Sequence, residues 1–210
     1  MKEIYLTFDD GPSATTRELL EVLDKHKVKA TFFVTCEFGE NKELLRLIKS
    51  KGHEIGLHSY SHNFAEIYKS VDAYLNDLQT IDDYVYKSIG EKKRIIRFPG
   101  GSGNISSLKY GGRIMPEIIK KTKQLGYIEF DWNAFSGDGN TNKTHSVIYY
   151  FFNAIKSINI KSKVIYLSHN RPGDRKSIKA LNYVIVYCKL MGYEFKKIDE
   201  TTIPINIEVK

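Results

Sequence analysis

The sequence lacks the features that would place it outside ordinary globular proteins. It has only two cysteines in 210 residues, Cys36 and Cys188, so it shows no disulfide framework, and it neither establishes nor excludes a single disulfide. No apolar run approaches the roughly 18 residues of a membrane-spanning helix. The first residues contain no apolar leader segment, which fits either a cytoplasmic protein or one trimmed of its leader. No Pro/Gly/Ser-rich linker, shift in composition or internal repeat divides the chain, so we expect one domain over residues 1–210.

The charge balance is basic but not concentrated. Lys and Arg number 32 against 25 Asp and Glu, which gives a net charge of +7. This excess suits anionic surroundings, such as nucleic acid, a membrane surface or an acidic cell-wall polymer. The densest basic cluster, residues 91–94, is short and contains Glu91. Scattered charge of this kind indicates a solvated surface rather than a nucleic-acid footprint.

Short apolar runs alternate with longer amphipathic segments along the whole chain. This alternation predicts an α/β fold with a mostly parallel sheet, a distorted (β/α) barrel of about seven parallel strands. Periodicity alone does not decide whether the barrel closes. The expected strands cover residues 4–8, 30–34, 54–57, 95–98, 127–132, 164–167 and 194–198. The expected helices cover residues 17–23, 42–50, 70–88, 116–125, 146–158 and 177–191.

Polar side chains follow four of these strands at the point where each strand ends. In α/β proteins with parallel strands, reactive groups gather at this carboxyl-end rim. We therefore expect acids, imidazoles and a guanidinium to converge there. The four clusters are Asp9-Asp10, His58 to His62, Arg97 to Gly101, and Ser168-His169-Asn170.

The first two clusters contain a candidate metal site. Asp9-Asp10 before Gly11-Pro12 would, on its own, be read as an ordinary turn. His58 and His62 are four residues apart, so both imidazoles reach one ion where the segment is helical. Two histidines and a carboxylate form a ligand set that leaves a coordination position open for water, which is typical of a catalytic rather than a structural site. The combination favours a metal site over chance spacing.

The ordered clusters resemble the successive motifs of the polysaccharide deacetylase family, the NodB-homology group also called carbohydrate esterase family 4. The matching segments are Thr7-Phe8-Asp9-Asp10-Gly11-Pro12, His58-Ser59-Tyr60-Ser61-His62, Arg97-Phe98-Pro99-Gly100-Gly101 and Leu167-Ser168-His169. The resemblance implies a distorted seven- or eight-stranded barrel and metal-dependent removal of acetyl groups from N-acetylated sugars. Some members of the family instead cleave O-acetyl esters of xylan.

The resemblance also implies a role for each matching residue. Asp10, His58 and His62 resemble the ligands of one divalent ion, with zinc expected and cobalt, manganese or nickel as substitutes. Asp9 resembles the catalytic base, Arg97 the group that orients it, and His169 the general acid. The backbone N–H of Gly100 resembles the oxyanion donor. The expected substrate contacts are Leu167 as a wall of the acetyl pocket, Trp132, Pro99 and Tyr60.

One motif of the family is less clear in this sequence. Its acidic residue, which tunes the acid histidine, aligns with either Asp131 or Asp138. We align Asp138, because the run from Trp132 to Asp138 better resembles one branch of the family. Gly139 then stands where a pocket tryptophan is often found. Trp132 or another aromatic residue must therefore close that wall, or the pocket is wider.

These expectations define a function and its alternatives. We expect an N-deacetylase of a peptidoglycan or chitin-oligomer type glycan that releases acetate. We also expect a monomer without a nucleic-acid partner or a transmembrane segment, extracellular or associated with the cell wall by resemblance. The alternatives are an O-acetyl xylan esterase, an amidohydrolase of small molecules, and a noncatalytic glycan or nucleic-acid binder.

Overall fold

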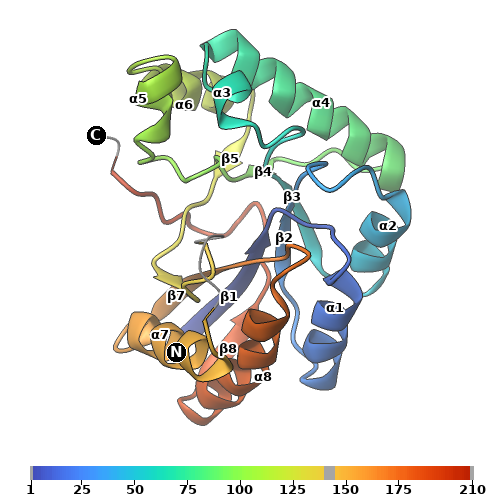
Figure 1. The fold of residues 1–210 in the computed structure, drawn as a ribbon, viewed down its shortest axis with the longest axis vertical. Helices are drawn as coiled ribbons and strands as arrows, with labels where there is room; N and C mark the ends of the chain where they lie inside the picture. Colours follow the sequence, from blue (N-terminus) through green and yellow to red (C-terminus); the bar gives the residue numbers. More distant parts are fainter. Residues whose placement is uncertain (1, 140–144, 209–210) are drawn as a thin grey trace.

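The computed structural model describes residues 2–139 and 145–208 and contains one curved sheet of parallel strands (Figure 1). The strand order is β5-β4-β3-β2-β1-β7-β6, and β8 pairs with β1. The strands are β1 (Lys2–Asp9), β2 (Thr31–Val34), β3 (Glu54–Leu57), β4 (Ile95–Ile96), β5 (Ile128–Glu129), β6 (Ala134–Phe135), β7 (Lys163–His169) and β8 (Tyr193–Lys196).

Strand β1 organises the sheet. It pairs with β7 along nearly its whole length, and this register places Asp9 beside His169. On the other edge of β1, β2 pairs with residues 7–9 and β8 with residues 2–5. Among the described residues no pairing joins β5 to β6, so the sheet curls into a half-barrel. The predicted α/β fold with a distorted parallel barrel is confirmed.

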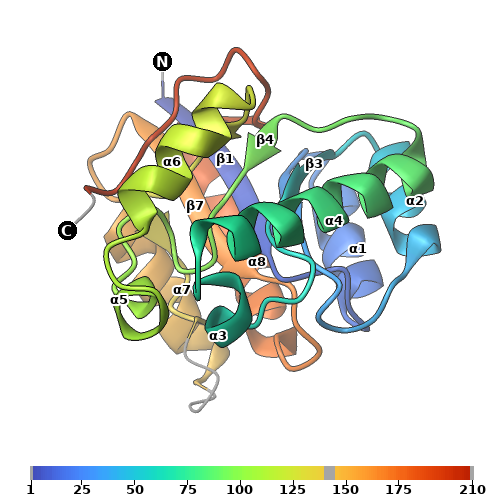
Figure 2. The same ribbon diagram turned by 90° about the horizontal axis from the view of Figure 1, so that it is seen from above.

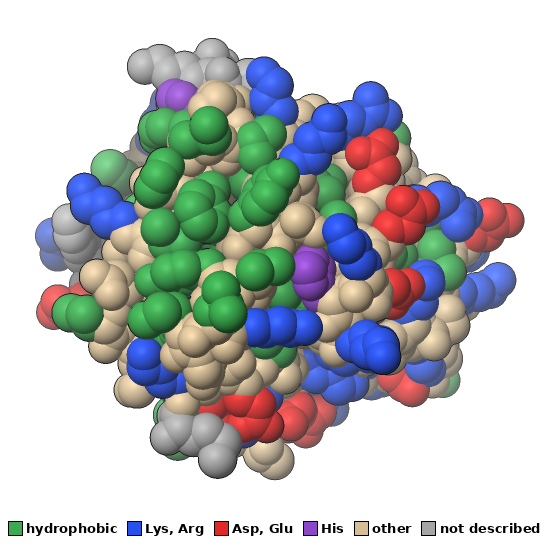
Figure 3. Space-filling model, turned by 90° about the horizontal axis from the view of Figure 1, so that it is seen from below, with side chains coloured by type: hydrophobic (Ala, Val, Ile, Leu, Met, Phe, Trp, Pro, Cys, Tyr) green, Lys and Arg blue, Asp and Glu red, His purple; other side chains and the backbone are tan. Residues whose placement is uncertain are grey.

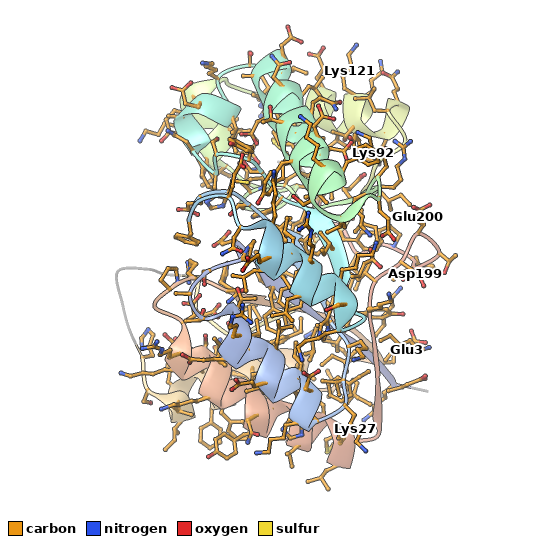
Figure 4. All side chains as sticks on the ribbon, turned by 90° about the vertical axis from the view of Figure 1, so that its right-hand side faces the viewer. Glu3, Lys27, Lys92, Lys121, Asp199 and Glu200 are labelled. Atoms are coloured by element: carbon orange, nitrogen blue, oxygen red, sulfur yellow. The ribbon has the colours of Figure 1, made fainter. Side chains whose placement is uncertain are left out.

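Helices pack on the outside of the curved sheet (Figure 1, Figure 2). Helices α1, α2 and α4 lie side by side on one flank (Figure 4), while α7 packs against α8 on another. The helices are α1 (Thr16–Lys25), α2 (Lys42–Ser50), α3 (Phe64–Ile67), α4 (Val71–Ile89), α5 (Ser106–Tyr110), α6 (Met115–Gln124), α7 (Val147–Ile158) and α8 (Arg175–Leu190).

Alternation along β1 separates two apolar cores. Ile4, Leu6 and Phe8 belong to the large cluster shared with the surrounding helices. Tyr5 belongs to a smaller cluster with residues of β2, β4 and β7, inside the half-barrel. Because successive side chains of a strand point to opposite faces, Asp9 lies on the same face as Tyr5. The strand therefore carries Asp9 to the rim on the inner face of the half-barrel.

The differences from the predicted elements fall in the irregular segments. Helices α3 and α5 and strand β6 were not predicted, because four-, five- and two-residue elements carry no readable periodicity. The strand expected over residues 127–132 is reduced to the two residues of β5. Both cysteines are free thiols, and Cys188 is fully buried, as its apolar surroundings predict. Within the described residues, every helix is too short or too polar to cross a bilayer.

Candidate active site

Asp9 is held by a fully buried arginine. Nη1 of Arg97 donates to Oδ1 of Asp9 at 2.8 Å and to Oγ1 of Thr7 at 2.7 Å. The rest of the guanidinium donates to the carbonyls of Phe130 and Asp131, at 2.8 and 3.0 Å. A buried charge is tolerated only when it is paired and hydrogen-bonded, and here every side of the guanidinium has a partner. One oxygen of Asp9 is therefore fixed, and Oδ2 faces the histidines, 3.9 Å from Nε2 of His58.

Asp10, His58 and His62 form a cluster with the geometry of a metal site. Nε2 of His58 lies 3.6 Å, and Nε2 of His62 3.3 Å, from Oδ1 of Asp10. One ligand atom from each of the three residues lies within 4.8 Å of the others. Asp10 has a positive φ of 74°, so the chain turns sharply after Asp9. The two adjacent carboxylates consequently point to different partners.

The remaining nitrogens of the two imidazoles fit a metal as well. Nδ1 of His58 donates to the carbonyl of Arg97 at 2.7 Å. Nδ1 of His62 lies 3.1 Å from Oε2 of Glu37. Hydrogen bonds at Nδ1 leave the lone pair of each Nε2 directed at the cluster, which is the usual arrangement of metal-binding histidines. The donor set present in the chain therefore fits a divalent ion.

The segment from His58 to His62 is not helical, so the helical spacing argument does not explain how the two imidazoles meet. His62 has a positive φ of 53°, and the chain reaches it through a bend. Asp77 of α4 braces this bend by accepting hydrogen bonds from the Ser59 hydroxyl at 2.6 Å and the Tyr60 N–H at 2.9 Å. Ser59 in turn accepts from the N–H of His62 at 2.9 Å. A carboxylate from a neighbouring helix thus holds the two histidines together.

His169 forms an ion pair with Asp138. Nδ1 of His169 lies 2.7 Å from Oδ1 of Asp138, whose other oxygen accepts from the Ser168 hydroxyl at 2.5 Å. Burial opposes a charge on His169, but the Asp138 carboxylate outweighs burial and raises the pKa of His169 to about 9. Burial alone would raise the pKa of Asp138, but its charge and hydrogen-bond contacts with His169 hold it well below its usual range. The pair is charged at neutral pH.

Asp131, the competing alignment, lies elsewhere. Its carboxylate accepts hydrogen bonds from the Ser102 N–H at 2.9 Å and the Ile207 N–H at 2.7 Å. It therefore ties the segment after β4 to the C-terminal tail. The structure places Asp138, and not Asp131, against His169.

A cavity of about 350 Å³ opens beside His169. Its wall includes Trp132 and Leu167, two of the predicted substrate contacts, together with Phe135. Gly139 also lines the cavity, and a Cβ at this position would stand 3.4 Å from Cε1 of His169. The absent side chain leaves this part of the wall open, and aromatic residues close other parts.

The other expected substrate contacts are placed less directly. The Tyr60 hydroxyl donates to Glu40 at 3.0 Å, and Tyr60 does not line the cavity beside His169. The carbonyl of Pro99 accepts from the Tyr68 hydroxyl at 2.8 Å. Gly100 is exposed with φ of 79°, and its N–H has no acceptor within the described part of the chain. This N–H therefore remains available to an incoming ligand.

Sequence reasoning missed three charged residues of the site: Glu37, Asp77 and Arg171. Nε of Arg171 lies 4.0 Å from Oδ2 of Asp10, and its Nη2 donates to the carbonyl of Asp138. Arg171 follows His169 closely, so its position at the rim could have been suspected. No sequence pattern marks Glu37, which contacts His62, or Asp77, which holds the bend between the two histidines.

Comparisons with known proteins identify the family to which the chain is similar. A family model described as polysaccharide deacetylase matches residues 1–127. A peptidoglycan-N-acetylglucosamine deacetylase of Bacillus cereus is 31% identical over 98% of this chain and 72% of its own. A peptidoglycan-N-acetylmuramic acid deacetylase of Bacillus subtilis is 32% identical over 95% of this chain and 71% of its own. The catalytic domain of a peptidoglycan N-acetylglucosamine deacetylase from Eubacterium rectale superposes with a TM-score of 0.95 at 34% identity, covering 100% of this chain and 94% of that one.

The fold and the site thus define a deacetylase scaffold, a parallel half-barrel with acids and histidines at its carboxyl-end rim. The chain belongs to the polysaccharide deacetylase family.

Proposed function

We propose that the protein is a metal-dependent N-deacetylase of a peptidoglycan or chitin-oligomer type glycan. The observation that carries the proposal is the convergence of three groups at one rim. Asp9 of the Asp9–Arg97 pair lies 3.9 Å from His58 of the Asp10, His58 and His62 cluster, and the register of β1 and β7 places Asp9 beside His169 of the His169–Asp138 pair. The relatives named as peptidoglycan and chitin deacetylases support the substrate class.

Asp10, His58 and His62 are the residues that would hold the metal. A divalent ion bound there, zinc or a first-row substitute, would supply Lewis-acid polarisation and would lower the pKa of a water from about 15.7 toward about 7.

Asp9 is proposed as the general base. Water attacks the carbonyl carbon of the acetamide, and Oδ2 of Asp9 takes the proton that water loses. Arg97 fixes the opposite oxygen of the same carboxylate. The N–H of Gly100, which has no acceptor among the described residues, is available to stabilise the oxyanion that develops on the carbonyl oxygen.

His169 is proposed as the general acid. The C–N bond breaks only when the nitrogen receives a proton, because an amine anion is a very poor leaving group. Asp138 keeps His169 protonated at neutral pH and directs Nδ1, which leaves Nε2–H for the departing nitrogen. The products are acetate and a free amino sugar.

The cavity beside His169 is proposed as the acetyl pocket. Leu167 and Trp132 give it apolar walls, which suit a methyl group rather than a charged substituent. With Gly139 in place of a larger residue, the wall of the pocket beside His169 is left open. The net charge of +7 suits approach to an acidic wall polymer.

Acetate release tests the function. The full chain is loaded with zinc and assayed on peptidoglycan, chitin oligomers and acetylxylan, with Asp9→Asn as the matched inactive variant. We expect acetate and new free amines from the first or second substrate, with a loss of about 10²- to 10⁴-fold in the variant. Release from acetylxylan alone would establish an O-acetyl esterase instead. Turnover of small acetylated amides alone would establish an amidohydrolase.

A further inference from the structure

A face formed by α7, α8 and one side of α1 lies outside the site and carries an unusual concentration of exposed hydrophobic side chains (Figure 3). The exposed fraction is 67% for Ile148, 59% for Phe152 and 82% for Leu190. Contiguous exposed apolar surface of this kind marks a binding site for a protein or a membrane. We call it the α7/α8 face, and its members are Ile148, Phe152, Tyr183, Val186 and Leu190.

Helical spacing aligns these side chains with lysines. Ile148, Phe152 and Lys156 recur every four residues and so share one stripe of α7. Lys179 occupies the same stripe of α8 as Tyr183, Val186 and Leu190, with Lys176 one turn earlier. The two helices pack together around a groove of about 790 Å³ that Val22, Phe151 and Lys25 also line.

The charge on α7 and α8 has one sign, whereas α1 also contributes Glu18 and Glu21. Helices α7 and α8 contain four lysines and one arginine but no Asp or Glu. Arg175 is paired with Glu18 at 2.9 Å. Among the described residues, Lys156, Lys176 and Lys179 have no carboxylate oxygen within 4.0 Å, the distance limit of an ion pair. The face therefore complements an anionic surface.

The opposite flank shows that this charge pattern is not general. Beside α2 and α4, Lys49 pairs with Glu91 at 2.5 Å and Lys93 with Glu54 at 2.8 Å. Lys92, labelled in Figure 4, reaches Asp82 at 3.1 Å. Lys49, Lys92 and Lys93 are thus neutralised within the chain, whereas Lys156, Lys176 and Lys179 have no carboxylate in ion-pair contact among the described residues.

Two copies of the chain meeting through the α7/α8 face would bring these unneutralised lysines together, which disfavours self-association. The apolar members of the face project from two adjacent helices. Tyr183 and the lysines of these helices have apolar stems with polar ends. Such side chains place their stems in hydrocarbon and their polar ends among headgroups. We infer that the α7/α8 face docks the protein on an anionic lipid bilayer, with Ile148, Phe152 and Leu190 entering the interface and the lysines contacting lipid phosphates.

Vesicle flotation with the full chain tests this inference. The probes are vesicles of phosphatidylcholine alone and of phosphatidylcholine mixed with phosphatidylglycerol. We expect binding only to the anionic vesicles and weakening as salt is added, since exposed charges are screened. Lys179→Glu reverses one charge of the face and should weaken partitioning into the anionic vesicles at least about fivefold. Phe152→Ser, which changes an exposed side chain, should weaken it about tenfold.

Variants on α6 and at the residue after it provide the controls. Lys121→Glu makes the same charge reversal and Leu125→Ser a comparable apolar-to-serine change at exposed positions outside the α7/α8 face, and both should leave flotation unchanged. Absent flotation at low salt, or flotation that the face and control variants weaken equally, would overturn the inference. The inference would also be overturned if the protein did not bind lipid but formed a dimer that Phe152→Ser dissociates. Retention on polyglutamate without flotation would also overturn it, and would indicate an acidic protein partner. The readout does not involve acetate release, so it stands apart from the proposed activity.

Discussion

His58 and His169 occupy similar places at the carboxyl ends of β3 and β7, yet the protein gives them opposite protonation states. Burial, with the nearby His62, lowers the pKa of His58 to about 3. Asp138 overcomes the same kind of burial and raises the pKa of His169 to about 9. The atom that contacts Nδ1 accounts for the difference: a backbone carbonyl for His58 and a carboxylate for His169. One imidazole is suited to hold a metal with its lone pair, and the other to donate a proton.

The largest effect is expected when His58, the metal-binding histidine of this comparison, is replaced. His58→Ala deletes one of three ligands, so the purified protein should lose its stoichiometric metal and its acetate release should fall to background. Metal content by mass spectrometry and acetate release measure the two effects. His26→Ala is the matched control, because His26 lies outside the site and contacts Asn182. A His58→Ala protein with full metal content would contradict the assignment.

Replacement of His169, the proposed general acid, should reduce turnover less than replacement of His58 and should affect the metal content differently. His169→Ala should reduce turnover by about 10²- to 10⁴-fold while the metal content stays normal, because His169 contributes a proton and not a ligand. The same two measurements applied to both variants separate the roles. Loss of metal in His169→Ala, or turnover close to that of the unchanged protein, would show that the two histidines are not distinguished in this way.

The carboxylate behind His169 should set the upper pH limit of activity. The acid form is present below the pKa of about 9, so turnover should fall as pH rises through that value. In Asp138→Asn the charge that raises this pKa is lost, and the alkaline limb should move down by about 1 to 3 pH units. Rate profiles against pH measure the shift.

Asp131 provides the control for that shift. Asp131→Asn weakens the hydrogen bonds to Ser102 and Ile207, so it should lower the free energy of unfolding by about 1 to 3 kcal/mol. It should leave the alkaline limb in place. A limb that moves with Asp131→Asn and not with Asp138→Asn would reverse the assignment of the two acids.

The smallest expected effect concerns the orientation of a metal ligand. Glu37→Gln keeps the size of the side chain that contacts Nδ1 of His62 but removes its charge. Zinc affinity should fall by about 10- to 100-fold, as is typical when a residue that orients a metal ligand is changed. Titration against a competing chelator measures it, and Glu43→Gln on the exposed side of α2 is the control. Equal zinc affinities of Glu37→Gln and Glu43→Gln would show that Glu37 does not contribute to the metal site.

The sequence predicted the parts of the site that depend on strand ends. Asp9, Asp10, Arg97 and His169 all follow recognisable apolar strands, and parallel pairing gathers such positions at one rim. It could not show how His58 and His62 meet, because the bend between them depends on Asp77 of a different element.

The ambiguity between Asp131 and Asp138 illustrates the same limit. Strand β6 has only two residues, and its register against β7 pairs Phe135 with Leu167. The chain then runs alongside the end of β7, which brings Asp138 to His169. Two residues give no detectable alternation, so periodicity could not reveal this pairing, and only the resemblance to one branch of the family favoured Asp138.

The sequence by itself determined the α/β class, the order of the motifs and the residue types at the rim, because alternating apolar runs and polar strand ends are local properties of the chain. The tertiary structure decided which histidine is neutral and which is charged, which acid supports His169, and which lysines remain without a carboxylate. Each of these depends on burial and on partners distant in sequence, and both of these properties arise only when the chain is packed.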